Sequence, residues 1–399
     1  MKIGVRGASR TLTNMDVASA ALIIQFLVSV AFNLMSSFQP LFISGALGYT
    51  LIEATSWTGV SQLAASSLMA LTAPFWGWMC DRVGTKKILI MVIAANTVVY
   101  SGMAMSSNVV QIVLFRGLQG CFGGISTVMF TLIAEVVHPT ELKRALSYQM
   151  AAMTIGGLIA PGVGGVLASI IGFRLTLATS AILFVCIIPV VAVLSMPPSE
   201  GKGATSKHFT VADFRSILPD SAALILIYIC ISFISPTVSW FLQSLGVPDE
   251  QLLLYTTAAT ILNGIAYAIA TPALTRMITD RTLPLLSTAA AVIIMATAFV
   301  VSPIQFIVLR VATGAVQAGI PPNLLGGKSG RKGASMGFLN SARFLGMAIG
   351  PYMATAILGT GEPPRPFYMF SAMALMSLVS SAFIYMTHRH PKSAATPTA

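Results

Sequence analysis

Long apolar runs, repeated from one end of the chain to the other, constrain this sequence more than any other feature. Of its 399 residues, 55% are hydrophobic and only 9% are charged, and the mean hydropathy is +0.83. A soluble core cannot hide that much apolar surface, whereas a helix of about 20 apolar residues crosses a bilayer. At that length the sequence predicts twelve spans, at residues 18–43, 55–79, 88–106, 110–134, 147–170, 175–196, 221–244, 252–276, 283–302, 304–326, 335–358 and 366–387.

The basic residues between these runs predict the orientation of the chain. Loops on the cytoplasmic side of a membrane carry an excess of lysine and arginine. With the N-terminus in the cytoplasm, nineteen of the 23 basic residues fall on that side, Arg343 among them, and only Arg174 and Arg365 fall on the other. We therefore expect both termini to be cytoplasmic. The net charge of +11 is explained by topology, and we expect no nucleic-acid partner because no soluble basic face is present.

The longest polar interruption divides the chain into two halves. It predicts a first six-helix bundle at 1–196, a cytoplasmic linker at 197–219 with a short amphipathic helix near 209–218, and a second bundle at 220–399. The expected fold is thus an all-α polytopic membrane protein with two pseudo-symmetric six-helix bundles.

An internal repeat supports this division. Arg116 recurs as Arg310 after 194 residues, and Pro161 recurs as Pro351 after 190. The pair Asp81-Arg82 recurs as Asp280-Arg281 at a similar offset. Two parallel six-helix halves with a substrate held between them are a known transporter plan.

A charged turn at residues 77–87 separates the second and third expected spans. Gly77 would allow close approach to a neighbouring helix, and Gly84 supplies a backbone conformation that other residues adopt at a cost. Asp81 and Arg82 can form an ion pair or cap a helix end. The simpler interpretation of the whole turn is a basic cytoplasmic loop that only sets the membrane topology.

This turn resembles the loop 2–3 signature of the major facilitator superfamily. The signature is matched at Gly77, Asp81, Arg82, Gly84, Lys86 and Lys87. The resemblance implies a conformational gate in which the aspartate lies against the start of the eleventh span. Glu135 is then the candidate partner of Arg82 or Arg144.

Arg116 is a charge inside an apolar run, which indicates a functional residue, although a snorkelling or structurally paired arginine is the alternative. The stretch resembles the helix 4 motif of proton-coupled facilitators, matched at Arg116 and Gly120, whose arginine lines the central cavity. Its charge requires compensation from helix dipoles, backbone carbonyls, amides such as Asn33 or Gln119, water or the substrate. Arg310 is the second candidate, and we expect its replacement to be better tolerated.

The fifth expected span carries a glycine-rich proline bend, and such bends also occur in ordinary helix packing. It resembles the antiporter motif of the exporter branch of the superfamily, with Ala160 in place of one glycine. The match falls on Gly156, Pro161, Gly164 and Gly165. The whole chain resembles twelve-helix drug:proton antiporters of the multidrug-efflux type.

The acidic residues all fall in expected loops or at helix ends, and the four histidines lie outside the apolar runs. Coupling to a proton gradient, which the resemblance implies, is therefore left open. A neutral to positive cavity favours neutral or anionic amphiphiles. The four cysteines lack metal-ligand spacing, and we expect no metal, no cofactor and no enzymatic activity.

Polar and aromatic side chains within the apolar runs are candidates for the substrate wall, although helix packing explains each equally well. They are Phe26, Asn33, Trp240, Asn263, Tyr267 and Gln317.

We expect a monomeric, multi-pass protein of a bacterial inner membrane that exports amphiphilic small molecules by alternating access. The alternatives are a transporter specific for one metabolite, such as a siderophore or a lipid, and a receptor on a transporter fold. The gate-like turn speaks against the receptor.

Overall fold

The computed structural model describes residues 3–137, 141–194, 211–278, 282–321, 324, 333–359 and 366–388, and that part of the chain is helical with no strand. Its apolar helices are long enough to cross a membrane. Eight stretches meet the requirements of length and hydropathy: Val17–Ser36, Thr85–Met105, Val109–Ile133, Tyr148–Ile171, Phe173–Val193, Leu218–Ser244, Asp249–Thr271 and Pro366–Met386.

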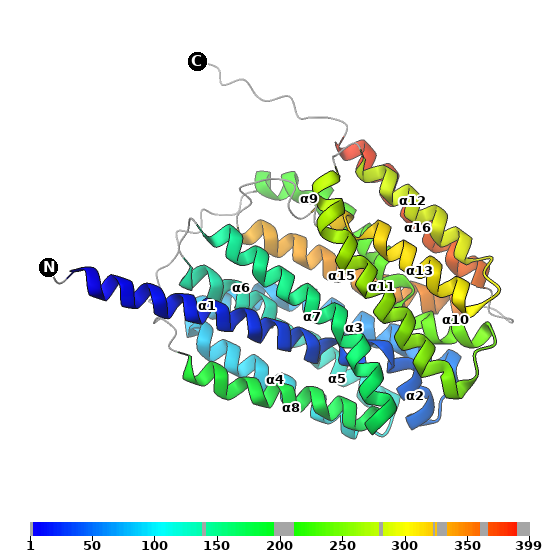
Figure 1. The fold of residues 1–399 in the computed structure, drawn as a ribbon, viewed down its shortest axis with the longest axis horizontal. Coiled ribbons are helices and arrows are strands. Elements are labelled where there is room, and N and C mark those ends of the chain that lie inside the picture. Colours follow the sequence, from blue (N-terminus) through cyan, green and yellow to red (C-terminus); the bar gives the residue numbers. More distant parts are fainter. Residues whose placement is uncertain are drawn as a thin grey trace, which may run out of the picture.

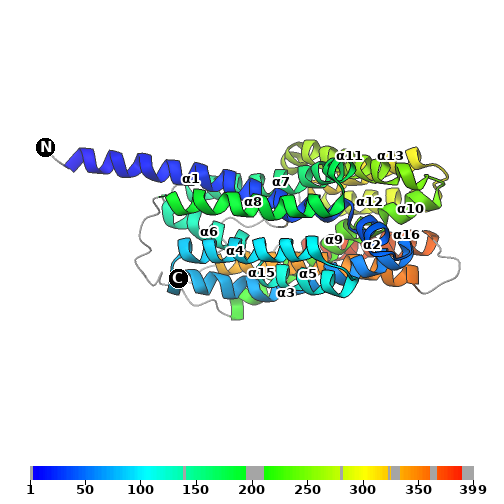
Figure 2. The ribbon, with the colours of Figure 1, turned by 90° about the horizontal axis from the view of Figure 1, so that it is seen from below.

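The first half is a bundle in which helices pack in pairs, α1 on α7, α4 on α8 and α3 on α5 (Figure 1). Its elements are α1 (Ile3–Asn33), η1 (Leu34–Ser37), α2 (Gln39–Leu47), α3 (Leu51–Val83), α4 (Thr85–Met105), α5 (Val109–Cys121), α6 (Ile125–Val136), α7 (Leu142–Ile171) and α8 (Phe173–Val193). Edge-to-face and tilted contacts among Phe32, Tyr100 and Phe184 fill its core. The first turns of α1 project beyond the other helices (Figure 2), so this helix begins well before residue 18, where the first span was predicted.

The second half repeats this pairing, with α15 on α9, α12 on α16 and α11 on α13. Its elements are α9 (Val211–Phe233), η2 (Ser235–Thr237), α10 (Val238–Ser244), α11 (Asp249–Met277), α12 (Leu283–Thr297), α13 (Pro303–Gln317), α15 (Gly333–Gly359) and α16 (Pro366–His388). Phe241 lies at its core, with ring centroids 5.0 Å from Phe306 and 4.9 Å from Phe370.

Several predicted spans are interrupted rather than continuous. The 3-10 turns η1 and η2 break the first span of each half, and prolines contribute, with Pro40 at the start of α2 and Pro236 inside η2. The fourth span breaks at residues 122–124 between α5 and α6. Equivalent breaks at the starts of both halves agree with an internal repeat.

Two further sequence assignments change in the structure. Residues 211–218, predicted to form a separate amphipathic helix, are the first turns of α9 and precede Pro219 in the same helix. Asp220 also lies within α9 and is only 4% exposed, whereas it was expected in a loop or at a helix end.

The helices that open the fourth and tenth predicted spans share one capping arrangement. Asn108 accepts a hydrogen bond from the backbone of Gln111 ahead of α5, and Ser302 accepts one from the backbone of Gln305 ahead of α13. In both, the glutamine side chain accepts a backbone N–H from the residue before the cap. At each helix start this reciprocal cap satisfies one free N–H group of the helix and that of the residue before the cap. The two sites are 194 residues apart, the spacing of Arg116 and Arg310.

Candidate gate and substrate sites

The charged turn between α3 and α4 is built around Gly84, whose φ of 98° lies in the region that favours glycine. Lys86 leaves this turn toward α8, where its Nζ donates to the carbonyls of Ala192 at 2.8 Å and Leu194 at 2.9 Å. A lysine in this position satisfies carbonyls that a helix end leaves free and complements the helix dipole. Lys86 therefore fastens two helices of the same half.

Glu135, at the end of α6, accepts a 2.7 Å hydrogen bond from Thr85 Oγ1. Arg82 instead places its guanidinium 4.3 Å from the centre of the Trp78 ring. Glu135 was predicted to pair with Arg82 or Arg144, and this structure shows Arg82 on the Trp78 ring, so the pairing with Arg144 stays a prediction. The side chains of Asp81 and Arg144 lie outside the described residues, as do Asp280 and Arg281.

The prediction that Gly77 permits a close helix approach is wrong. A Cβ atom at Gly77 would meet Thr127 at an ordinary 3.7 Å. The close approach occurs further along, where a Cβ at Gly120 would overlap the backbone of Ala65 and one at Gly124 would overlap the Trp76 ring. Glycines at the end of α5 and at the start of α6 therefore bring these helices close to α3.

Arg116 is buried, and protein carbonyl groups surround its guanidinium. Nη1 donates to Gln119 Oε1 at 2.8 Å, and Nη2 donates to Gln39 Oε1 and, at 3.4 Å, to Gln62 Oε1. Gln119 Nε2 in turn donates to the Tyr100 hydroxyl at 2.8 Å. Among the proposed sources of compensation, side-chain amides are the ones observed, and of the two named in advance Gln119 takes part. Asn33 donates to its own helix, at the Ser29 carbonyl.

Gln39 and Gln62 were not among the predicted site residues. A polar amide inside an apolar run was the available signal, since such groups are costly in a membrane unless they are satisfied. A second buried amide cluster was missed for the same reason. There Gln149 of α7 donates to Gln25 of α1 at 3.1 Å, and Gln25 donates to Ser29.

The glycine-rich motif of α7, which contains Pro161, packs against both neighbouring helices. A Cβ atom at Gly156 would overlap the backbone of Phe26 in α1, and one at Gly164 would overlap the backbone of Leu34 at the start of η1. A Cβ atom at Gly165 would instead project toward the second half, where it would overlap the side chain of Thr257. The motif therefore holds α7 against α1 within its own half and against α11 of the other half.

The halves meet at α3 with α15 and at α7 with α11, and each meeting places a threonine against a glycine. Thr257 of α11 occupies the space that a Cβ of Gly165 would need, and Thr355 of α15 occupies that of Gly59 on α3. The repeat relates these positions, because Gly59 and Thr257 are 198 residues apart and Gly165 and Thr355 are 190 apart. The two contacts are therefore reciprocal, with glycine and threonine exchanged.

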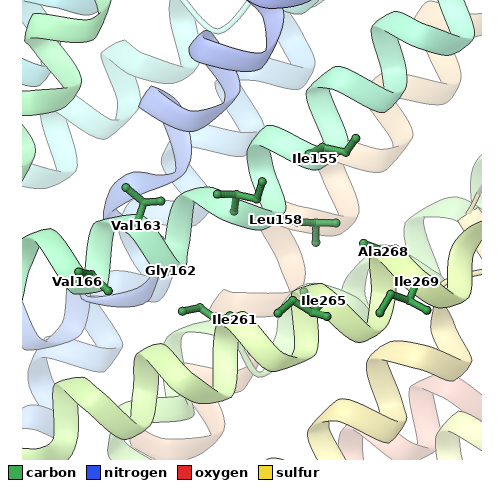
Figure 3. A pocket seen from close by; sticks show the side chains of 11 residues that line it. Ile155, Leu158, Gly162, Val163, Val166, Ile261, Ile265, Ala268 and Ile269 are labelled. Atoms are coloured by element: carbon green, nitrogen blue, oxygen red, sulfur yellow. The ribbon is translucent and has the colours of Figure 1, made fainter.

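An apolar groove of about 530 Å³ follows the crossing of α7 and α11. Figure 3 shows Ile155, Leu158 and Val163 of α7 beside Ile261 and Ile265 of α11. Its lining is apolar throughout.

The predicted substrate-wall residues do not form one site. Trp240 is 5% exposed and belongs to the apolar core of the second half, which favours the helix-packing alternative. Asn263 packs against Gly314 of α13. Gln317 is buried, and its Nε2 lacks a partner among the described residues. Phe26 is half-buried beside Gly156.

Tyr267 lies in a different cluster, at the convergence of α9, α11 and α15. Arg343 of α15 places its guanidinium 4.8 Å from the Phe344 ring centre and 5.9 Å from that of Tyr228. Tyr267 is close enough to interact electrostatically with both Tyr228 and Arg343. Arg343 is half-buried inside α15, whereas charge counting placed it in a segment between helices.

A bundle of membrane-spanning helices that joins two repeated halves along glycine contacts, and that buries arginine among amides, defines a membrane transporter. The comparison with protein families agrees. The family model described as the Major Facilitator Superfamily matches residues 21–233 and 221–399, and the chain belongs to that superfamily.

Relatives and solved structures extend over nearly the whole chain. Multidrug resistance protein MdtG of Proteus mirabilis (strain HI4320) is 25% identical over 381 residues, covering 91% of this chain and 94% of that protein. The fold is similar to an inward-facing, occupied bacterial homologue of the human lysosomal transporter Spinster, with a TM-score of 0.74, 14% identity and coverage of 96% and 99%. It is also similar to a D-xylose-proton symporter, with a TM-score of 0.72, 13% identity and coverage of 94% and 97%.

Proposed function

We propose that this protein is a secondary-active exporter of amphiphilic small molecules that works by alternating access. The reciprocal contacts of Gly165 with Thr257 and of Gly59 with Thr355 carry the proposal. On the expected topology both contacts lie toward the outer ends of their helices. They close the outer side in this state, and separating them would open it.

The moving bodies in this proposal are the halves 1–196 and 220–399, joined by the linker 197–219. Twelve spans, cytoplasmic termini, a monomeric state, location in a bacterial inner membrane and the absence of a nucleic-acid partner belong to the same proposal. The gate at the charged turn would form on the cytoplasmic side when the outer contacts separate.

The substrate class follows from the cluster of Arg343, Tyr228 and Tyr267. A half-buried guanidinium beside aromatic rings suits a flat apolar body with a neutral or anionic polar end. Relatives named multidrug resistance proteins support a range of substrates. A single neutral or anionic metabolite, such as a siderophore or a lipid, is the alternative.

The test is uptake into inside-out vesicles that contain the purified protein. We expect several neutral and anionic amphiphilic dyes to accumulate, and permanent cations to accumulate less. Vesicles with Gly165→Leu, which the contact with Thr257 cannot accommodate, are the matched inactive control. Imposed proton gradients of either sign test the coupling. Uptake of only one compound from a varied panel would favour the specific transporter, and no uptake of any compound would contradict export.

A further inference from the structure

Arg310 and Arg116 occupy the same position in two helices of the same design. Each is the eighth residue of its helix, Val109–Cys121 for one and Pro303–Gln317 for the other, and both helices begin with the reciprocal glutamine cap. The residue three positions further along is Gln119 in the first half and Thr313 in the second. The environments of the two guanidinium groups can therefore be compared directly.

The two environments differ in hydrogen-bond acceptors. Arg116 donates to three glutamine carbonyls. Nε is buried without a partner in both arginines, but the Nη groups of Arg310 have no hydrogen-bond or ion-pair partner among the described residues, unlike those of Arg116. Its neighbours Thr297 and Thr313 donate their hydroxyl protons to the carbonyls of Ile293 and Leu309 in their own helices. Arg310 is half-buried, and a guanidinium without an acceptor in an apolar setting is costly, so water or an anion from outside the chain completes its hydrogen bonds.

A small cavity lies at the Arg310 side chain. It measures about 20 Å³ and is bordered by Thr297 and Thr313 together with apolar side chains, Phe306 and Phe370 among them. A space of this size holds about one water molecule or an ion of similar dimensions. It does not hold a drug-sized molecule, for which pockets of about 300 Å³ or more are usual.

We propose that Arg310, with Thr297 and Thr313, forms a binding site for one small monovalent anion of halide size within the second half. The anion accepts hydrogen bonds from Arg310, as the glutamine carbonyls do from Arg116. It is held by the guanidinium and enclosed by the rings of Phe306 and Phe370, whose edges carry positive potential. A bound anion therefore stabilises the folded second half by RT ln(1 + c/Kd), which grows with the anion concentration c.

The test follows thermal unfolding of the full-length protein in nanodiscs of zwitterionic lipid. Sodium chloride replaces sodium gluconate at constant ionic strength, so that screening does not change. We expect the melting temperature to rise with the logarithm of chloride or bromide concentration above Kd, and not to rise with gluconate, which is too large for the cavity. Arg310→Met should abolish the rise. Lys87→Met, which removes an exposed cation, should keep it.

A second variant tests the proposal independently, in case Arg310→Met does not fold. Thr313→Asp places a carboxylate one helical turn from Arg310. In gluconate this variant should melt at or above the temperature of the unchanged protein in chloride, and it should no longer respond to chloride. A chloride response that persists in both variants, or that is absent from the unchanged protein, would overturn the proposal.

Discussion

Thr257 of α11 fills the space that the absent side chain of Gly165 leaves on α7, and it does so across the boundary between the two halves. The same contact occurs in reverse between Gly59 and Thr355. Threonine is stiff because it is branched at Cβ, so it cannot move aside as a long side chain would. Each contact is therefore sensitive to the addition of one methyl group.

The first prediction uses this reciprocity. Gly165→Ala should destabilise the closed outer side by about 1–3 kcal/mol, the usual cost of overpacking, and so shift the population toward forms open to the outside. The exchange Gly165→Thr with Thr257→Gly reproduces the arrangement seen at Gly59 and Thr355 and should restore closure. Labelling of a cysteine placed near the outer ends of α7 and α11 by an impermeant maleimide measures the change, in a background without native cysteines.

Gly157→Ala on the same helix is the matched control for that experiment, because a Cβ there meets only Asn33 at an ordinary 3.7 Å. If the single and the exchanged variants label equally, the threonine–glycine contacts do not hold the halves together.

The second prediction concerns Arg116. Arg116→Ala leaves the carbonyl oxygens of Gln39, Gln62 and Gln119 without their donor, at about 1–3 kcal/mol for each group that stays buried. We expect loss of transport together with a lower melting temperature in the absence of substrate. Arg116→Lys should also fail, because an ammonium group cannot reach three carbonyls as a planar fork does.

Leu118→Ala is the control on the same helix, since that side chain is 44% exposed. An unchanged melting temperature in Arg116→Ala with transport lost would show that the arginine acts on the substrate and does not hold the helices.

The sequence predicted the helical class and the repeat well, because hydrophobic run length and motif spacing depend on local residues. It identified Arg116 as a candidate functional residue but missed its partner Gln39. Gln39 is 77 positions away in the chain, and it becomes a partner only through the rotation of α2 against α5. Two helices can be predicted separately with good accuracy while the residues that face each other stay undetermined.

The differences between prediction and structure have the same physical origin. Arg343 was assigned to a segment between helices because counting basic residues favours loops, whereas aromatic rings of α9 and α15 hold it inside the bundle. Trp240 satisfied the criteria for a substrate wall, but an aromatic ring in an apolar run serves equally well as core. Whether such a residue faces a loop, a cavity or the core depends on which distant helices cover it, and the composition of the sequence does not reveal that packing.

The third prediction concerns acid sensitivity at the start of α3. Thr50 caps this helix, and its side-chain and backbone hydrogen bonds to Glu53 hold the pKa of that carboxyl below its usual value. A lowered pKa in the folded state contributes stability above the unfolded pKa, and the contribution is lost as the pH falls through the folded pKa. Thr50→Ala should therefore lower stability at neutral pH and narrow its difference from the unchanged protein in acid. A parallel shift at every pH would contradict the capping role.

The fourth prediction tests the topology that the positive-inside argument implies. Reporter fusions after Lys202 and after Lys392 should both report a cytoplasmic location. A fusion after Gly172, between α7 and α8, is the matched control and should report the opposite side. A periplasmic signal from either lysine position would contradict the two-by-six arrangement.

The fifth prediction places substrate charge at Arg343. Arg343→Gln keeps a hydrogen-bonding side chain but removes the positive charge beside Tyr228 and Tyr267. A charge-assisted hydrogen bond contributes about 1.5–3 kcal/mol, so uptake of anionic amphiphiles should fall about tenfold or more while neutral ones change little. Arg343→Lys should recover only part of the loss, because lysine does not stack on rings as a planar guanidinium does.

Uptake of an anionic and a neutral dye in the same vesicles gives the ratio that decides this prediction, with surface level measured for each variant. Lys87→Gln removes an exposed cation from the charged turn and should leave the ratio unchanged. An equal fall for both dyes in Arg343→Gln would assign the arginine to helix packing, because only a group that contacts the substrate charge can separate two substrates that differ in charge.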